Sequence, residues 1–508
     1  MRLPDLLDYH ARAEPTRLFA ADQCTEIGYG DAASHAARLA AGMRAGGLRR
    51  GDRVALLARN RAEYVLWQFA CARAGVCLVL LNFHLAEKEL EYILGDCTPR
   101  WLVTEARFQA VADRLSRGLD SIERVVMLDA DGHPDSWLVI GRGDPVPDAA
   151  EVSVEDDLYI MYTSGTTGRP KGAVHTQRSL MTTVTQLGIT WDLNAGERQL
   201  VIAPLFHAAA SIMALTGIVR GGSLIIHERF DPEAVVAALH EARIDRTAMV
   251  PSMIHACLEH ASPALLKTPP PLRSVIYGAS AIETGLLERA MRTFGCGFIQ
   301  GFGQTESNTL TTLTEADHRR ALDGHEHLLK SAGRAVPGTA LRIVDADGRD
   351  LPAGEVGEIV ARGEQSMRGY WRRDEATAAT VVDGWLHTGD AGCLDDEGYL
   401  YIRDRLTDMI ISGGENVYPR EVENVLAEHP QVLEVAVIGM PDPRWGEAVT
   451  AVVVPRPGEV PALDDLQAFA AGQLARYKVP RRLEIVTALP RNATGKVLKR
   501  ELRITCAS

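Results

Sequence analysis

The chain has 508 residues, of which 46% are hydrophobic and 24% charged, and its formal net charge is −13. This length allows two or more domains with a large buried core, and the acidic balance argues against nucleic acid or anionic membrane as a general partner. Eight cysteines without a C-x-x-C pair indicate reduced thiols in a cytoplasmic protein. The sequence has no uncharged run long enough to span a membrane and no signal-peptide-like start.

Helix-like and strand-like segments alternate through the first 128 residues. The predicted elements are a helix at 34–44 that stops at Gly46-Gly47, a strand at 54–58, an amphipathic helix at 62–74 and a strand at 76–81. Such alternation predicts layered α/β structure. The stretch 141–157 is rich in Pro, Gly and acidic residues, and it predicts a surface connection to the next strand.

That next strand, at 158–162, leads into a loop rich in glycine, hydroxyl and basic residues. The loop reads Thr163-Ser164-Gly165-Thr166-Thr167-Gly168-Arg169-Pro170-Lys171-Gly172. Free backbone N–H groups, hydroxyls and a cation together suit a polyphosphate. The loop is not a Walker A loop, because Pro170 interrupts the spacing that this motif requires. A hydroxyl-rich surface turn is the alternative interpretation, but the position between a buried strand and a helix favours a phosphate loop.

The alternation continues beyond this loop and then changes. Strands are predicted at 200–203, 223–226, 247–250 and 274–277, with helices at 211–219, 232–242, 252–260 and 283–293. Short strands and glycine turns at 338–402 predict a β-rich subdomain. The last hundred residues predict a small α+β domain, with helices at 420–429 and 463–475 and strands at 431–439, 449–454 and 483–486.

The segment Tyr162–Gly172 resembles the phosphate-binding signature of the adenylate-forming superfamily, which includes acyl-CoA synthetases, peptide-synthetase adenylation domains and luciferases. Further motifs resemble this superfamily in its usual order along nearly the whole chain. The resemblance implies a large N-terminal domain at 1–403, built of layered α/β subdomains plus a β-rich subdomain. It also implies a small mobile α+β C-terminal domain at 404–508.

The resemblance also implies a binding site for ATP and Mg²⁺. Thr305 would bond a phosphate oxygen, Glu306 would hold Mg²⁺ as an oxygen ligand, and Phe302 would stack on adenine where tyrosine is common. Asp390 would accept hydrogen bonds from the ribose hydroxyls, with Arg405 beside it. Taken alone, an Asp after a glycine is more often a turn former. The remaining expected nucleotide contacts are Thr163, Ser164, Gly165, Thr166, Thr167, Gly168, Lys171, Gly278, Ala279 and Ser280.

For the acid, the segment Ala203–His207 resembles the part of the family that borders the acyl pocket. Taken alone, His207 is as often structural as functional. The small residues at 208–211 either leave room for an acyl group or begin a tightly packed helix. Neutral, apolar surroundings favour a fatty or aromatic acid over a charged one, with a fatty acid preferred.

For catalysis and the thiol, Pro490–Lys496 resembles the catalytic-lysine motif, so Lys496 is the expected catalytic lysine rather than a solvated surface charge. Gly413 and Gly414 would line the tunnel for coenzyme A, and Trp445 would contact it. Thr407 stands at the family's domain pivot, where Asp or Lys is usual.

The resemblance therefore implies an AMP-forming acyl-CoA synthetase that uses ATP, Mg²⁺ and coenzyme A. A stand-alone enzyme that loads a carrier protein is the main alternative. An amino-acid adenylation domain and a non-enzymatic interaction protein are less well supported. A homodimer remains open.

Overall fold

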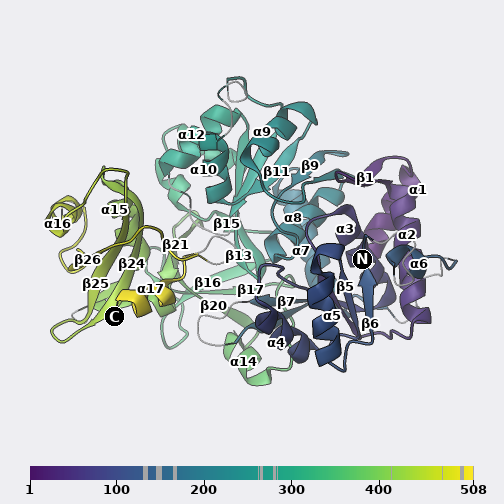
Figure 1. Ribbon diagram of the computed structural model, residues 1–508. Coiled ribbons are helices and arrows are strands. Elements are labelled where there is room, and N and C mark those ends of the chain that lie inside the picture. Colours follow the sequence, from purple (N-terminus) through teal and green to yellow (C-terminus); the bar gives the residue numbers. More distant parts are fainter. Residues whose placement is uncertain are drawn as a thin grey trace. The chain divides into compact units, whose positions relative to one another are not determined.

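The computed structural model in Figure 1 contains two compact units. The first unit holds Met1–Ala340 and Ala361–Leu386, and the second holds Leu341–Val360 and His387–Ser508. The predicted division into domains at residue 403 stays a prediction. The structure describes residues 1–129, 136–144, 152–163, 169–260, 263, 267–278, 282, 284–412, 415–471, 473–491 and 497–506, without the side chains of Val139 and Thr407.

One sheet of the first unit contains the strand that precedes the phosphate loop. Its strands are β3 (Arg53–Leu57), β4 (Cys77–Leu80), β5 (Trp101–Thr104), β6 (Arg124–Met127), β7 (Asp157–Thr163), β8 (Lys171–Thr176) and β18 (Gly369–Tyr370). Their order is β18-β8-β7-β4-β3-β5-β6. The strands from β7 to β6 are parallel, whereas β8 and β18 are antiparallel to their neighbours. The central strands are continuous apolar runs because both faces of the sheet are covered.

Helices connect these strands as the alternation predicts. They are α2 (Tyr29–Ala45), α3 (Ala62–Ala74), α4 (Glu87–Cys97), α5 (Gln109–Gly118) and α6 (Trp137–Ile140), with a 3₁₀ turn η1 (Ala106–Phe108). The predicted helix at 62–74 is confirmed at both ends. Helix α2 starts five residues before the predicted Ser34, because Tyr29 at its first position is fully buried.

A second sheet of the first unit has nine strands in the order β15-β14-β13-β12-β11-β9-β10-β1-β2. They are β1 (Leu18–Ala21), β2 (Glu26–Gly28), β9 (Arg198–Val201), β10 (Ser223–Ile226), β11 (Arg246–Met249), β12 (Ser274–Gly278), β13 (Gly297–Gln304), β14 (Asn308–Leu313) and β15 (Arg334–Ala335). The associated helices are α7 (Gln177–Thr190), α8 (Ala208–Ile218), α9 (Pro232–Glu241), α10 (Pro251–His260), α12 (Thr284–Phe294) and α13 (Glu315–Leu322), followed by the 3₁₀ turn η2 (Glu326–Lys330). The predicted strands and helices of this region are present.

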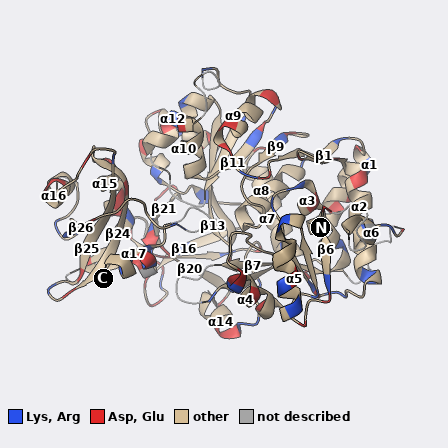
Figure 2. Ribbon diagram, in the orientation of Figure 1, with Lys and Arg blue, Asp and Glu red and all other residues tan. Residues whose placement is uncertain are grey.

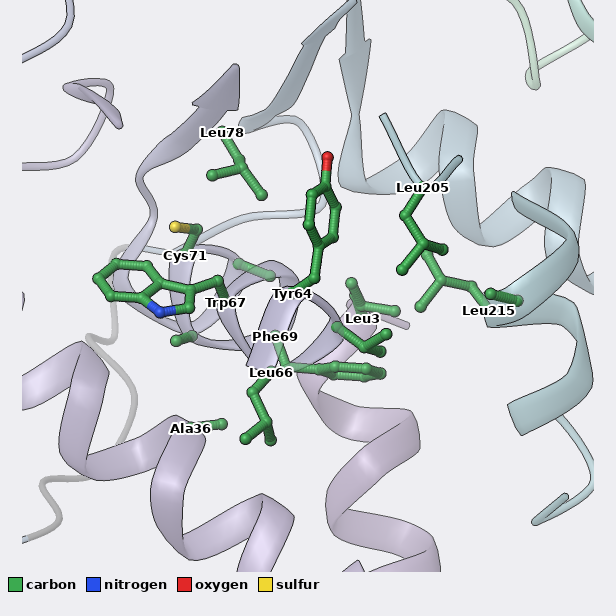
Figure 3. Packing of buried hydrophobic residues seen from close by; sticks show 14 of the residues in the cluster. Leu3, Ala36, Tyr64, Leu66, Trp67, Phe69, Cys71, Leu78, Leu205 and Leu215 are labelled. Atoms are coloured by element: carbon green, nitrogen blue, oxygen red, sulfur yellow. The ribbon is translucent and has the colours of Figure 1, made fainter. Parts of the chain in front are cut away.

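Helix α3 lies inside the main core of the first unit. All thirteen of its residues are buried, so it has no solvent-exposed polar face. The prediction that this helix is amphipathic is therefore wrong. Figure 3 shows its side chains Tyr64, Trp67 and Phe69 among apolar residues that include Leu78 of β4 and Leu215 of α8. The first helix, α1 (Leu3–Ala13), contributes Leu3 to the same cluster. This one core therefore joins residues from both sheets.

The second unit is built mainly of antiparallel strands. Its first sheet contains most of β16 (Ala340–Val344), β17 (Gly357–Arg362) and β20 (Trp385–Leu394), and all of β21 (Leu400–Arg405). In the first unit, α14 (Asp374–Thr380) is followed by β19 (Val381–Val382), which pairs with Trp385 and Leu386 at the start of β20. Its second sheet contains β22 (Ile410–Ser412), β23 (Glu415–Val417), β24 (Val432–Asp442), β25 (Gly446–Pro455) and β26 (Arg482–Ile485). The other elements are η3 (Leu406–Asp408), α15 (Pro419–Ala427), α16 (Leu463–Ala471) and α17 (Lys499–Cys506). The predicted α/β fold class, with a β-rich part and a small α+β part, is confirmed.

Charged residues of both signs are interspersed along the ribbon (Figure 2). Within the described ranges, no helix has both the length and the apolar character needed to cross a bilayer.

Candidate active site

The phosphate loop connects β7 to β8 at the carboxyl end of β7. The two strands pair in register up to Thr163 and Lys171, and the Thr163 hydroxyl donates to the Lys171 carbonyl at 3.4 Å. Gly172 must be glycine, because a Cβ there would lie 2.5 Å from a methyl group of Ile160. The described part of the hairpin therefore places Thr163 and Lys171 at the two ends of the loop. The predicted contacts Ser164, Gly165, Thr166, Thr167 and Gly168 lie outside the described residues.

The Thr305–Glu306 pair lies in the tight turn between β13 and β14. A buried histidine from β8 holds this turn: His175 Nε2 is 2.6 Å from the Thr305 carbonyl oxygen. A carbonyl only accepts, so Nε2 carries the hydrogen and Nδ1 accepts from the Asn308 amide at 3.2 Å. Burial lowers the pKa of His175 to about 4, so the ring is neutral near pH 7. The hairpin and the turn are thus joined by a hydrogen bond through a neutral ring.

Asn308 closes the same turn from the other side. Its backbone is in the left-handed region, with φ of 53°, where asparagine is better tolerated than most residues. Its amide also donates to the Gln365 carbonyl at 2.7 Å. The Met367 N–H donates to the Glu306 carbonyl at 2.7 Å. The segment before β18 therefore fixes the backbone of the turn.

The Glu306 carboxylate accepts a hydrogen bond from the Tyr370 hydroxyl at 2.8 Å. The Lys171 ammonium lies 4.9 Å from the centre of the Tyr370 ring. Tyr370 is in β18, beside β8, and its Cα pairs with that of Ala173. Neither Tyr370 nor His175 could be identified as a site residue from the motifs in the sequence. A polar histidine inside the otherwise apolar strand β8 is a signal that a buried partner exists, whereas nothing in the Gly369-Tyr370-Trp371 stretch points to Glu306.

The expected adenine wall lies where β12 and β13 end. Gly278 pairs with Gly301, and a Cβ on Gly278 would lie 2.4 Å from the Gly301 carbonyl oxygen. The strands approach so closely that only glycine fits there. Phe302 is half-buried one residue further along. Ala279 and Ser280 lie outside the described residues.

His207 occupies the N-cap position of α8, directly after Phe206. Its Nε2 is buried and has no hydrogen-bond partner among the described residues. Burial, and secondarily the nearby His84, lowers the pKa of His207 to about 4, so its ring is also neutral near pH 7. The small residues at 208–211 were interpreted either as room for an acyl group or as the start of a helix. They form the start of α8, which begins at Ala208.

Asp390 and Arg405, the expected ribose contacts, lie in the second unit on adjacent strands. Their Cα atoms are paired between β20 and β21, and Arg405 Nε lies 2.7 Å from an Asp390 carboxylate oxygen. Asp390 is 5% exposed. A buried carboxylate needs such a partner, so the two residues form an ion pair with each other.

The expected coenzyme A contact Trp445 lies in the turn between β24 and β25. The guanidinium of Arg481 is 3.8 Å from the centre of its ring, and that of Arg444 is 4.8 Å away. Cations stacked on an indole in this way also provide charges for phosphate groups. Gly413, Gly414 and Lys496 lie outside the described residues, as does the Thr407 side chain.

Two families of known proteins match this chain. The family "AMP-binding enzyme" matches residues 7–371, and "AMP-binding enzyme C-terminal domain" matches residues 421–496. The chain belongs to the AMP-binding enzyme family. The predicted superfamily is thereby confirmed, and the chain is an adenylate-forming enzyme of the acyl-CoA ligase class.

Individual relatives of this AMP-binding enzyme match it over nearly their whole length. It is similar to a feruloyl-CoA synthase from Streptomyces sp, with 40% identity over 97% of this chain and 96% of the relative. It is also similar to the fatty acid–[acyl-carrier-protein] ligase ScoC from Streptomyces coeruleorubidus, with 37% identity over 97% and 94%. Among solved structures, ATP-bound MatB from Rhodopseudomonas palustris superposes with a TM-score of 0.90 at 29% identity, over 99% of both chains.

ATP and coenzyme A fit an AMP-binding enzyme of this class. For a metal, the described residues contain no group of three or more His, Cys, Asp or Glu side chains that could hold one. Magnesium at nucleotide sites usually has one or two carboxylate ligands and takes the rest from phosphates and water. Glu306, held by Tyr370 through one carboxylate oxygen, fits that arrangement.

Proposed function

We propose that this AMP-binding enzyme activates a fatty or aromatic carboxylic acid with ATP and transfers the acyl group to coenzyme A. In the first step a carboxylate oxygen attacks the α-phosphorus, a new P–O bond forms, and the bond to the β-phosphate breaks to release pyrophosphate. In the second step the sulfur of the thiol attacks the acyl carbonyl, and AMP leaves with the electrons of the broken C–O bond. The observation that carries the proposal is the joining of the phosphate hairpin to the Thr305–Glu306 turn through His175.

The roles of the residues follow from charge. Negative charge must be stabilised on the phosphates as pyrophosphate leaves, so fixed cations contribute most. Lys171 would bind the β- and γ-phosphates, and Lys496 would bind near the α-phosphate and the attacking carboxylate. Glu306 would hold Mg²⁺, which supplies further positive charge to the phosphates when bound.

Two further groups would orient the substrates. Phe302 and the paired glycines Gly278 and Gly301 would flank adenine, while Asp390 and Arg405 would bind the ribose. His207 would border the acyl group as a neutral ring, because the pKa of His207 is lowered to about 4. His207 would therefore position the acid without carrying charge.

The apolar surroundings of His207 support an acid with an apolar body. Phe206 lies next to it, and Phe83 packs against Phe206. The names of the two relatives cover an aromatic acid and a fatty acid, so both classes belong in the substrate panel.

A second candidate function differs from the first in the molecule that accepts the acyl group. ScoC is named for an acyl-carrier protein, so loading of a carrier protein is the alternative. The arginines stacked on Trp445 favour coenzyme A, whose phosphates need cations.

The experiment incubates the purified protein with ATP, Mg²⁺, coenzyme A and a panel of fatty and aromatic acids. Acyl-CoA and AMP should form together with at least one acid. If pyrophosphate exchanges into ATP in the presence of acid but no acyl-CoA forms, the result would favour a carrier protein over coenzyme A as the acyl acceptor. Absence of exchange with every acid would contradict adenylation itself.

We further propose that the protein is cytoplasmic and forms a homodimer. The cytoplasmic location is supported by the eight cysteines, all of which are free. Light scattering of the purified protein tests the homodimer, and a monomer mass of 55.3 kDa would contradict it.

A further inference from the structure

We propose that Tyr370 is a positioning residue that keeps Lys171 and Glu306 separately charged and ready for ATP and Mg²⁺. This inference rests on the proposed function. A lysine and a glutamate close enough to share one tyrosine would ordinarily pair with each other. Such a pair would have to be broken before the cation could bind a phosphate and the carboxylate a metal ion.

Tyr370 contacts both Lys171 and Glu306, and neither contact neutralises their charges. Its ring faces the Lys171 ammonium at 4.9 Å from the centroid, within the range of a cation–π contact. Its hydroxyl donates to Glu306 Oε1 at 2.8 Å. Among the described residues, neither Lys171 nor Glu306 has an ion-pair partner. The tyrosine therefore orients a cation and an anion without neutralising either.

The backbone around Tyr370 fixes the ring in this position. Its strand pairs with β8 next to the hairpin, and the Trp371 N–H donates to the Gly172 carbonyl at 2.8 Å. The Tyr370 N–H donates to the Thr377 hydroxyl at 2.9 Å. Two neighbouring elements, β8 and α14, thus hold the residue, as positioning requires.

The two halves of the side chain predict two separable effects. Tyr370→Phe keeps the ring and removes the hydroxyl that donates to Glu306, so it should affect the Mg²⁺-dependent part of nucleotide binding. Tyr370→Leu loses the ring as well, so it should also affect the part that depends on Lys171. No merely structural role of Tyr370 predicts this division.

The test measures the Kd of the full chain for α,β-methylene-ATP by calorimetry, once in EDTA and once in saturating Mg²⁺. Tyr370→Phe should leave the Kd in EDTA within about twofold of wild type and weaken the Mg²⁺ value about tenfold, the usual worth of a hydrogen bond to a charged group. Tyr370→Leu should also weaken the EDTA value about threefold. Tyr401→Phe, which removes a tyrosine–carboxylate bond to Asp395 in the second unit, is the matched control and should change neither.

Two results would overturn the inference: an equal loss with and without Mg²⁺ in Tyr370→Phe, or no loss in either variant. A thermal melt of each variant checks folding. A double-mutant cycle is a second test. Glu306→Gln should reduce the dependence of the Kd on Mg²⁺, and adding Tyr370→Phe to it should cause no further reduction. Failure of these tests leaves the proposed function intact if the wild type exchanges pyrophosphate into ATP in the presence of acid.

Discussion

The buried ring of His175 should make the first unit sensitive to acid. Burial lowers the pKa of His175 from its usual 6.5 to about 4, while the unfolded chain regains the usual value. Between these two pH values the unfolded state binds more protons, so stability increases with pH. The contribution of His175 is complete above pH 6.5 and is lost as the pH falls to about 4. A change of this size corresponds to about 3 kcal/mol.

The perturbation is His175→Gln. Glutamine can still donate to the Thr305 carbonyl, but it does not titrate. The variant should be less stable than wild type by about 1 kcal/mol at pH 8, because the Asn308 amide loses its acceptor. Between pH 6.5 and 4 it should lose less stability than wild type does. The two curves should therefore cross near pH 6, about where wild type has lost about 1 kcal/mol.

The assay is urea unfolding at several pH values, followed by tryptophan fluorescence. Six of the seven tryptophans lie in the first unit, so the signal reports mainly on that unit. His318→Gln is the matched control. The pKa of His318 is also lowered to about 4 by burial, but its ring bonds to Tyr277 and the Thr314 carbonyl instead of the Glu306 turn.

Both glutamine variants should flatten the pH dependence of unfolding. A second pair of variants, His175→Leu and His318→Leu, tests the link to the site. His175→Leu removes the bond to Thr305 and should lower pyrophosphate exchange, whereas His318→Leu should not. A His175→Gln curve parallel to that of wild type would refute the reasoning.

Three further predictions concern the proposed reaction. Lys496→Ala should reduce acid-dependent pyrophosphate exchange about 10²- to 10³-fold while sparing thioester formation from supplied acyl-AMP; equal loss of both half-reactions would contradict its assigned role. Asp390→Asn should weaken ATP binding and destabilise the second unit by about 1 kcal/mol, since it removes the ion pair with Arg405, whose guanidinium remains partly exposed to water; an unchanged thermal midpoint and ATP affinity would argue against both effects. His207→Ala should raise KM for the acid more than it lowers kcat, and it should leave the pH profile between 6 and 8 unchanged because the ring is already neutral; a fall in kcat at constant KM would instead indicate a role in the chemical step.

The elements that the sequence predicts well are those whose burial is visible in the chain itself. Strands β3 and β4 are apolar runs, and helix α3 is a mostly apolar segment that ends before Gly75, so their positions could be predicted from the local pattern. The amphipathic character predicted for α3 was wrong because all of its residues are buried. The start of α2 was missed because Gly30 and Asp31 in its first turn resemble a loop. Tertiary burial of Tyr29 overrides that local signal.

The site divides in the same way. Glu306 and Lys171 could be identified because each lies in a short, ordered motif. Tyr370 could not, because its function depends on an edge strand that joins β8 from almost 200 residues away. Hydrogen bonds such as that from His175 to Thr305 depend on packing between two sheets, which no local pattern records.

The pairing of β18 with β8 also has a consequence for synthesis of the chain. A ribosome releases the phosphate hairpin long before Gly369 and Tyr370, and the edge of β8 has no strand partner on that side until they emerge. Exposed strand edges invite association with other chains. During translation, the last partner of this sheet therefore both protects a vulnerable edge and completes the surroundings of Glu306.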